Sequence, residues 1–167
     1  MIRLSISVVH YDSPLSQLQS LIRSLEMSII YLRRHHELAV IPLFIIDNSN
    51  DSSVVSELYS AENQRLEEIA VELRRIEGHG NIGYGRAHNL TLQVIDSDFH
   101  LILNPDVIFE ENTLHLALAR MIENEAIKAL SPSTSDRYGN KQYLCKSYPS
   151  VFTLLIRGLG LRVLEKL

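Results

Sequence analysis

The segment Asn104-Pro105-Asp106 interrupts an apolar stretch that runs from residue 101 to residue 108, "LILNPDVI". It places an amide and a carboxylate on either side of a rigid proline. Such oxygen atoms are the ligands that Mg²⁺ and Mn²⁺ prefer. A plain turn is the alternative, because Asn-Pro and Pro-Asp are common turn dipeptides. The rest of the chain has to decide whether this segment is a plain turn or part of a binding site.

A glycine-rich loop, "GHGNIGYG", occupies residues 78–85, and "GHGNIG" matches the G-x-G-x-x-G pattern of dinucleotide-binding loops. Glycines allow backbone amides to approach a pyrophosphate at a helix N-terminus. That pattern normally follows a hydrophobic first strand, however, and "ELRRIE" before it is charged. A P-loop is excluded because no G-K-[ST] follows. An NAD(P)-dependent oxidoreductase is one alternative that this loop leaves open.

Composition narrows the class of protein. The 167 residues are 46% hydrophobic and 22% charged, which suits one folded domain with a core. A net charge of −4 disfavours nucleic acid as a partner. The single Cys145 excludes an internal disulfide or a cysteine-rich zinc site. Residues 1–9 are too short for a signal peptide, and no apolar segment reaches the ~20 residues of a membrane span. We expect a cytoplasmic protein.

Hydrophobic periodicity predicts alternating strands and helices. Strands are expected at four segments: 3–9, 38–47, 99–107 and 127–133. Helices are expected from Pro14 to about residue 34, from about Val54 onward, and over 86–95 and 113–122. Residues 66–76 suit either a helix or a short strand, and residues 136–140 suit a turn.

This alternation predicts an α/β domain with a mostly parallel sheet flanked by helices. Ligands of such sheets gather at the carboxyl ends of the strands. Tyr11, Asp47 and the Asn104-Pro105-Asp106 segment all follow predicted strands. We therefore expect these polar groups to converge at one edge of the sheet.

Five segments taken together resemble the family 2 glycosyltransferases of the GT-A fold, and most closely the bacterial rhamnosyltransferase-like branch. In chain order they are "SVVHYDS", "IIDNSNDSS", "NIGYGRAHN", "LILNPDV" and "DRYGNKQYLCKSYPSVFTLLIRGLGL". They follow the order of the family and cover almost the whole chain. The resemblance implies a GT-A type, Rossmann-like sheet.

The family implies an inverting transfer of a sugar, such as rhamnose, from a nucleotide-sugar donor. The donor would be a dTDP- or UDP-sugar. The acceptor would be a glycan or lipid-linked precursor of a polysaccharide or O-antigen. The cofactor would be a divalent metal, Mg²⁺ or Mn²⁺.

Site residues follow from the matching positions. By resemblance, Tyr11 packs against the base of the donor and Asp47 accepts a hydrogen bond from the base or ribose. Asn104 and Asp106 occupy the D-x-D position, where they reach the ribose and the metal. Asn104 replaces the first aspartate of that motif, which keeps an oxygen ligand and removes one charge.

The glycine-rich loop supplies the remaining matches. Asn81 and Gly83 would lie close to the nucleotide, Arg86 would meet phosphate charge, and Asn89 would support the loop from the following helix. Three positions depart from the family pattern: His10, Asp12 and Thr91. These departures bear on the shape of the nucleotide pocket.

The family continues into an acceptor-binding half that carries the general base. After Asp136 the one acid in this sequence is Glu165, so no catalytic base is assigned. We expect residues 1–167 to form a single nucleotide-sugar-binding GT-A domain, truncated before the acceptor-binding half. A non-catalytic nucleotide-sugar-binding module is the second functional hypothesis.

The C-terminal segment, residues 150–167, is strongly apolar but carries Arg157 and Arg162. The favoured interpretation is packing on the missing half or on another copy of the chain, which would make a homo-oligomer. The alternative is an interfacial helix on an anionic membrane, at the inner face of the cell membrane.

Overall fold

A computed structural model describes residues 1–136 and 138–142. The chain divides into two units, Met1–Lys128 and Ala129–Leu167. The C-terminal segment for which membrane or partner packing is predicted lies outside the described residues. In the described part of the chain no helix is long and apolar enough to cross a membrane.

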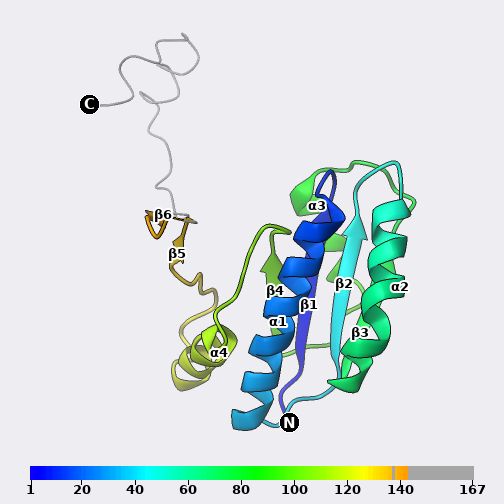
Figure 1. Ribbon diagram of the computed structural model, residues 1–167. Coiled ribbons are helices and arrows are strands. Elements are labelled where there is room, and N and C mark those ends of the chain that lie inside the picture. The colour runs from blue at the N-terminus through cyan, green and yellow to red at the C-terminus, as the bar shows by residue number, and fades with distance from the viewer. Residues whose placement is uncertain (137, 143–167) are drawn as a thin grey trace, which may run out of the picture. The chain divides into compact units, whose positions relative to one another are not determined.

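Strands and helices alternate along the first unit (Figure 1). The elements are β1 (Leu4–His10), α1 (Leu15–His35), β2 (Ile41–Asp47), α2 (Ser53–Glu68), β3 (Val71–Ile76), α3 (Tyr84–Thr91), β4 (Phe99–Leu103) and α4 (Thr113–Glu123). The four strands form one parallel sheet in the order β3-β2-β1-β4. The predicted α/β class with a parallel sheet is confirmed.

The central strand β1 is buried on both faces, and its side chains alternate between them. Leu4, Ile6 and Val8 belong to the main core, which α1 and α2 cover together with part of α4. On the other face Val9 packs with a smaller cluster that includes Ala87 of α3. The sheet is therefore covered on both sides, as expected for parallel strands.

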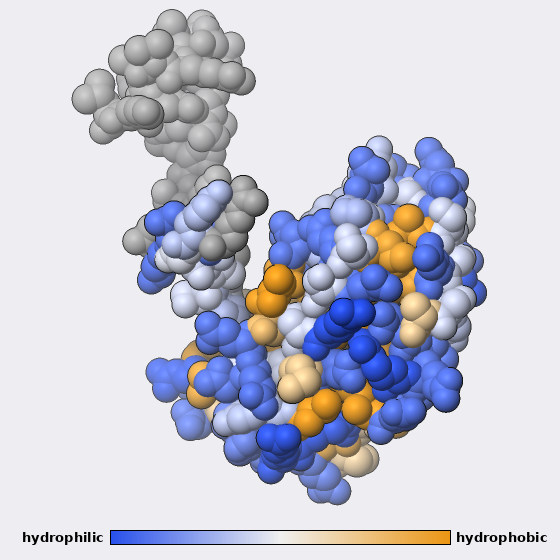
Figure 2. Space-filling view, viewed as in Figure 1, coloured by the Kyte–Doolittle hydropathy of each residue, from blue (hydrophilic) through white to orange (hydrophobic). Residues whose placement is uncertain are grey.

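Helices α1 and α2 lie side by side over one face of the sheet (Figure 1). Figure 2 shows that this side presents mostly hydrophilic residues, with a few hydrophobic ones between them. The buried stripe of α1 consists of Leu18, Leu21, Ile22, Leu25, Ser28, Ile29 and Leu32. This three- and four-residue spacing is the amphipathic pattern that predicts the helix from the sequence.

The ambiguous segment 66–76 divides between two elements. Helix α2 ends at Glu68, Ala70 turns the chain with a φ of 56°, and β3 begins at Val71. Val71 and Leu73 are buried, whereas Glu72 and Arg74 are exposed. This charged strand is acceptable because it lies at an edge of the sheet.

The prediction of a strand at residues 127–133 is wrong. No regular strand forms there in the part of the chain that the structure describes, since Pro132 lacks a backbone donor and the side chains of residues 128–133 are exposed. The second unit instead has the short antiparallel pair β5 (Thr134–Ser135) and β6 (Lys141–Gln142). The predicted turn joins them, with the amide of Gly139 donating to the carbonyl of Asp136 at 2.9 Å.

Candidate functional site

A cleft of about 410 Å³ opens where β1 and β4 end and α3 begins. Ten described residues line it: Val9, Tyr11, Ser13, Gln17, Asn48, Asn81, Tyr84, Asn104, Pro105 and Asp106. Four of the predicted site residues, Tyr11, Asn81, Asn104 and Asp106, are thereby brought together. Their positions follow from the parallel strands, whose carboxyl ends share one edge.

Two asparagines hold the glycine-rich loop against the end of β2. The Nδ2 atom of Asn48 donates to Oδ1 of Asn81 at 3.0 Å, and Oδ1 of Asn48 accepts the amide of Ile82 at 3.1 Å. Oδ1 of Asn81 also accepts the amide of Gly83 at 3.0 Å. Asn48 is buried, so its two bonds are partly shielded from water, whereas the bond between Asn81 and Gly83 is exposed. The loop is therefore a fixed wall of the cleft.

Gly83 stands directly before α3 with φ 85° and ψ 153°. A side chain in this backbone conformation is strained, although the space around the position is open. The loop follows the edge strand β3 and not the first strand β1. It thus lacks the placement that the dinucleotide fingerprint requires.

Asp47 ends β2 beside His10, its register partner at the end of β1. Its Oδ1 atom accepts the hydroxyl of Ser49 at 2.6 Å and the amide of Ser49 at 3.0 Å. Burial acts to raise the pKa of Asp47, but the hydrogen bonds from Ser49, with smaller contributions from the Ser52 hydroxyl and from His10, outweigh it, so the pKa lies below its ordinary value. The Asp47 side chain is therefore a buried, ionised acceptor.

The other oxygen of this carboxylate, Asp47 Oδ2, is buried and has no hydrogen-bond partner among the described residues. Nδ1 of His10 is likewise buried and has no hydrogen-bond partner among the described residues. Burial lowers the pKa of His10 despite the nearby carboxylates of Asp47 and Asp12. A neutral histidine and an ionised aspartate thus lie next to each other at the ends of β1 and β2, and neither is among the described residues that line the cleft.

Tyr84, the first residue of α3, crosses the cleft to the loop after β4. Its hydroxyl donates to Oδ1 of Asn104 at 2.7 Å. Burial raises the pKa of Tyr84, and the nearby carboxylate of Asp106 raises it further. The phenol therefore stays protonated at neutral pH. It donates its proton to Asn104 and so orients that amide.

Four predicted site residues are not among the described residues that line the cleft: Asp47, Gly83, Arg86 and Asn89. Arg86 and Asn89 are exposed on α3. Their proposed contacts with phosphate and with the loop stay predictions. Conversely, sequence reasoning missed Asn48 as a site residue. Its signal was its position, directly after Asp47 at the end of a buried strand.

The side chains of Asp106 and Asn104 fit a divalent metal ion whose remaining ligands are phosphates and water. The described residues contain no group of three or more His, Cys, Asp or Glu side chains placed to bind a metal. Asp106 offers one carboxylate and Asn104 an amide oxygen, whose second lone pair is open beside the bond from Tyr84. Mg²⁺ commonly binds through one or two carboxylates and completes its shell with phosphates and water.

Solved structures share this architecture. TarS from S. aureus, residues 1–349, aligns over 74% of this chain and 33% of its own, with 20% identity and a TM-score of 0.53. The mannosyltransferase PcManGT from Pyrobaculum calidifontis, solved in complex with GDP-Man and Mn²⁺, aligns over 72% of this chain and 32% of its own. Its identity is 15% and its TM-score 0.55. The chain has the fold of these glycosyltransferases.

That likeness confirms the predicted fold and spans about a third of the length of each of these two chains. No protein-family model matches the sequence, and no curated protein matches it. The rhamnosyltransferase-like branch stays a prediction.

Proposed function

We propose that this chain is the donor-binding part of an inverting glycosyltransferase of family 2 type. The observation that carries the proposal is the cleft at the carboxyl edge of the sheet, lined by Tyr11, Asn104 and Asp106. It combines an exposed aromatic ring, an amide and a carboxylate in a fold shared with solved glycosyltransferases. These groups suit a base, a ribose and a metal-bound diphosphate.

The buried Asp47 supports the nucleotide assignment. Its Oδ2 atom has no partner among the described residues, and a buried carboxylate oxygen without a donor is unfavourable. A ring N–H of the base or a ribose hydroxyl would supply that donor. Tyr11, with 55% of its surface exposed, would stack on the base.

Asp106 and Asn104 would hold Mg²⁺ or Mn²⁺ together with the phosphates of the donor. The metal, when bound, neutralises negative charge on the leaving diphosphate. Tyr84 keeps the amide oxygen of Asn104 in one orientation through its 2.7 Å hydrogen bond. The protein part of the site is thereby arranged before the donor enters.

In the proposed reaction the acceptor hydroxyl attacks the anomeric carbon of the sugar, the bond to the diphosphate breaks, and a general base takes the hydroxyl proton. Among the described residues that line the cleft, Asp106 is the one acid, and it is assigned to the metal. The general base is therefore not assigned to a described residue. We propose that this chain supplies the donor side of the reaction.

The donor is proposed to be a dTDP- or UDP-sugar, with rhamnose as the expected sugar. The acceptor is proposed to be a lipid-linked precursor of a polysaccharide or O-antigen. Such an acceptor would place a cytoplasmic enzyme at the inner face of the cell membrane.

Ligand-dependent thermal stability tests the proposal. The purified chain is heated with dTDP-, UDP- and GDP-sugars and with NAD(P), each with and without Mn²⁺. We expect a sugar nucleotide to raise the melting temperature and Mn²⁺ to increase the effect, because ligands that bind the folded state stabilise it. Stabilisation by NAD(P) alone would instead support the oxidoreductase hypothesis.

A further inference from the structure

A chain of hydrogen bonds, called here the serine–histidine file, runs along β1 on the face that α3 covers. Ser97 Oγ contacts Ser5 Oγ at 2.8 Å, and Ser5 Oγ contacts Nδ1 of His100 at 2.7 Å. Ser7 Oγ then contacts Nε2 of His100 at 2.9 Å and Nδ1 of His88 at 2.8 Å. Ser5 and Ser7 are fully buried, so the file is a polar feature inside the sheet–helix interface.

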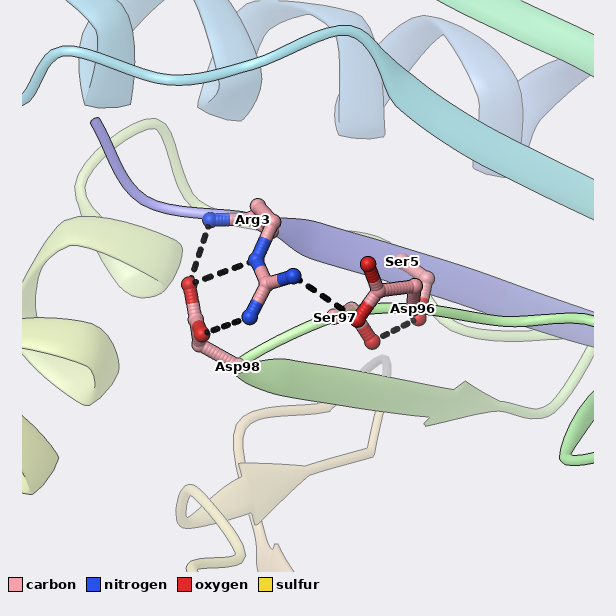
Figure 3. Close-up of polar contacts among 5 residues, drawn as sticks. All are labelled: Arg3, Ser5, Asp96, Ser97 and Asp98. Atoms are coloured by element: carbon pink, nitrogen blue, oxygen red, sulfur yellow. Dashed lines mark hydrogen bonds and ion pairs between the residues drawn. The ribbon is translucent and has the colours of Figure 1, made fainter.

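The amino end of the file is held by an ion-pair cluster (Figure 3). The guanidinium of Arg3 donates to Oδ1 of Asp98 and to Oδ1 of Asp96, each at 2.7 Å. The backbone amide of Arg3 donates to Oδ2 of Asp98 at 2.9 Å. Ser97 lies between the two aspartates, so the cluster fixes it beside Ser5 at the start of the sheet.

The single proton of the Ser7 hydroxyl couples the tautomers of His88 and His100. The hydroxyl of Ser7 has one proton, and it lies between Nε2 of His100 and Nδ1 of His88. It can donate to one ring only, so the other ring has to donate to it if both contacts are hydrogen bonds. With neutral rings, both histidines then carry their proton on Nε2, or both carry it on Nδ1.

The carboxyl end of the file reaches the cleft. His88 is 4% exposed and lies one helical turn after Tyr84 on α3. The two rings meet edge to face, with centroids 4.5 Å apart and an interplanar angle of 76°. Tyr84 in turn donates to Asn104 across the cleft. Tyr84 is otherwise 48% exposed, so the edge-to-face contact with His88 is a restraint on the phenol that orients Asn104.

We propose that His88 is a positioning residue of the cleft, locked by the serine–histidine file, and that it acts on the ligand through Tyr84 and Asn104. The proposal rests on the proposed function only for the identity of the ligand, a nucleotide sugar. Buried polar networks fix one arrangement when every member has a partner. The four contacts of the file meet that condition for Ser5, Ser7 and His100. His88 is held through Nδ1 alone, since its Nε2 is buried without a hydrogen-bond partner among the described residues.

The first test needs no ligand. Long-range ¹H–¹⁵N correlation spectra of the labelled chain at pH 7.5 distinguish a protonated ring nitrogen from a bare one. Single substitutions assign the His88 and His100 signals. We expect matching tautomers, both Nε2–H or both Nδ1–H. Opposite tautomers would overturn the file, because Ser7 could not then be bonded to both rings through its single proton.

The second test is a double-mutant cycle on sugar-nucleotide affinity, measured by calorimetry. Ser7→Ala breaks the file, and Tyr84→Phe removes the phenol. We expect each to weaken binding about fivefold, the size of one hydrogen bond, and the double variant to be no weaker than either single variant. Losses that multiply would overturn action through Tyr84.

Ser28→Ala is the matched control, since Ser28 is another fully buried serine but contacts α4 through the amide of Leu114. It should leave affinity within about twofold of the wild type. If the wild-type chain binds no sugar nucleotide, the proposed function fails on its own. The positioning is then decided by the side-chain amide signals of Asn104, which should shift in Ser7→Ala and not in Ser28→Ala. Unchanged Asn104 signals in Ser7→Ala would overturn the positioning.

Discussion

The hydroxyl of Tyr84 donates a 2.7 Å hydrogen bond to Oδ1 of Asn104 and so joins the first turn of α3 to the loop that follows β4. These two residues are 20 positions apart in the sequence and come from different elements. The bond sets one side of the Asn104-Pro105-Asp106 segment, while the proline restricts its backbone. The bond fixes the geometry of this segment, and its ligand-binding role stays a proposal.

Asp106→Ala should abolish metal-dependent nucleotide binding and leave the fold intact. Asp106 is exposed in the loop after β4, so its loss removes a ligand and creates no cavity. Calorimetric titration of a sugar nucleotide with and without Mn²⁺ measures the effect. Glu110→Gln, a change at another exposed acid of the same loop, is the matched control. Unchanged Mn²⁺-dependent affinity in Asp106→Ala would contradict the metal assignment.

Asp47→Asn tests the base or ribose contact. The amide keeps an oxygen for the hydroxyl and amide of Ser49 but replaces the charged acceptor Oδ2. We expect about tenfold weaker binding of both the nucleotide and the free nucleoside, because a hydrogen bond to a charged group contributes about 1.5–3 kcal/mol. If only the diphosphate form lost affinity, Asp47 would act on the phosphates instead.

The sequence predicted the elements that strong periodicity encodes. Alternating Leu4, Ile6 and Val8 predicted β1, and the apolar spacing of α1 predicted its length within a residue or two. The prediction of a strand over residues 127–133 was wrong because apolar content alone does not show whether a neighbouring strand exists. Strand pairing is a tertiary property that a local pattern does not contain.

The cleft was predicted only in part, because some of its contacts are also tertiary properties that a local pattern does not contain. Tyr11 and Asp106 follow strands, and the geometry of a parallel sheet brings strand ends together. The link between Ser7 and His88 joins positions 81 residues apart, and nothing in either local pattern indicates it. Ser7 is fully buried, and its hydroxyl contacts His88 of α3 and His100 of β4.

Gly83→Ala and Gly85→Ala form a matched pair on neighbouring positions. Gly83 has φ 85°, so a side chain there should destabilise the chain by about 1–2 kcal/mol. Gly85 lies inside α3 without a positive φ or a close neighbour, so alanine should stabilise by about 0.5–1 kcal/mol. Urea unfolding followed by circular dichroism gives both values. Equal effects of the two changes would show that the loop backbone is not constrained as described.

The 167-residue chain should bind donor without transferring sugar. Asp106 is the one acid among the described residues that line the cleft, and it is assigned to the metal. A general base typically contributes about 10²- to 10⁴-fold to the rate. Slow hydrolysis of the donor is expected, since water needs no acceptor pocket. An assay with dTDP-rhamnose and a lipid-linked N-acetylglucosamine acceptor measures transfer, and multiple turnovers above background would place a base within this chain.

Stability should fall as the pH falls from about 6.5 to about 4, and His88 should account for much of the change. Burial, with a smaller contribution from His100, lowers the pKa of His88 from 6.5 to about 4. Between these values the unfolded chain binds a proton that the folded chain excludes, so acid favours unfolding. The contribution of His88 is present above pH 6.5 and is on the order of 3 kcal/mol.

Urea unfolding at several pH values measures this dependence. His88→Gln removes the titrating ring, so the stability of this variant should change less between pH 7 and pH 4.5 than that of the wild type. Part of the slope should persist, because burial also lowers the pKa of His10 and of His100. An equal slope in the variant and the wild type would show that His88 is protonated in the folded chain as readily as in the unfolded one.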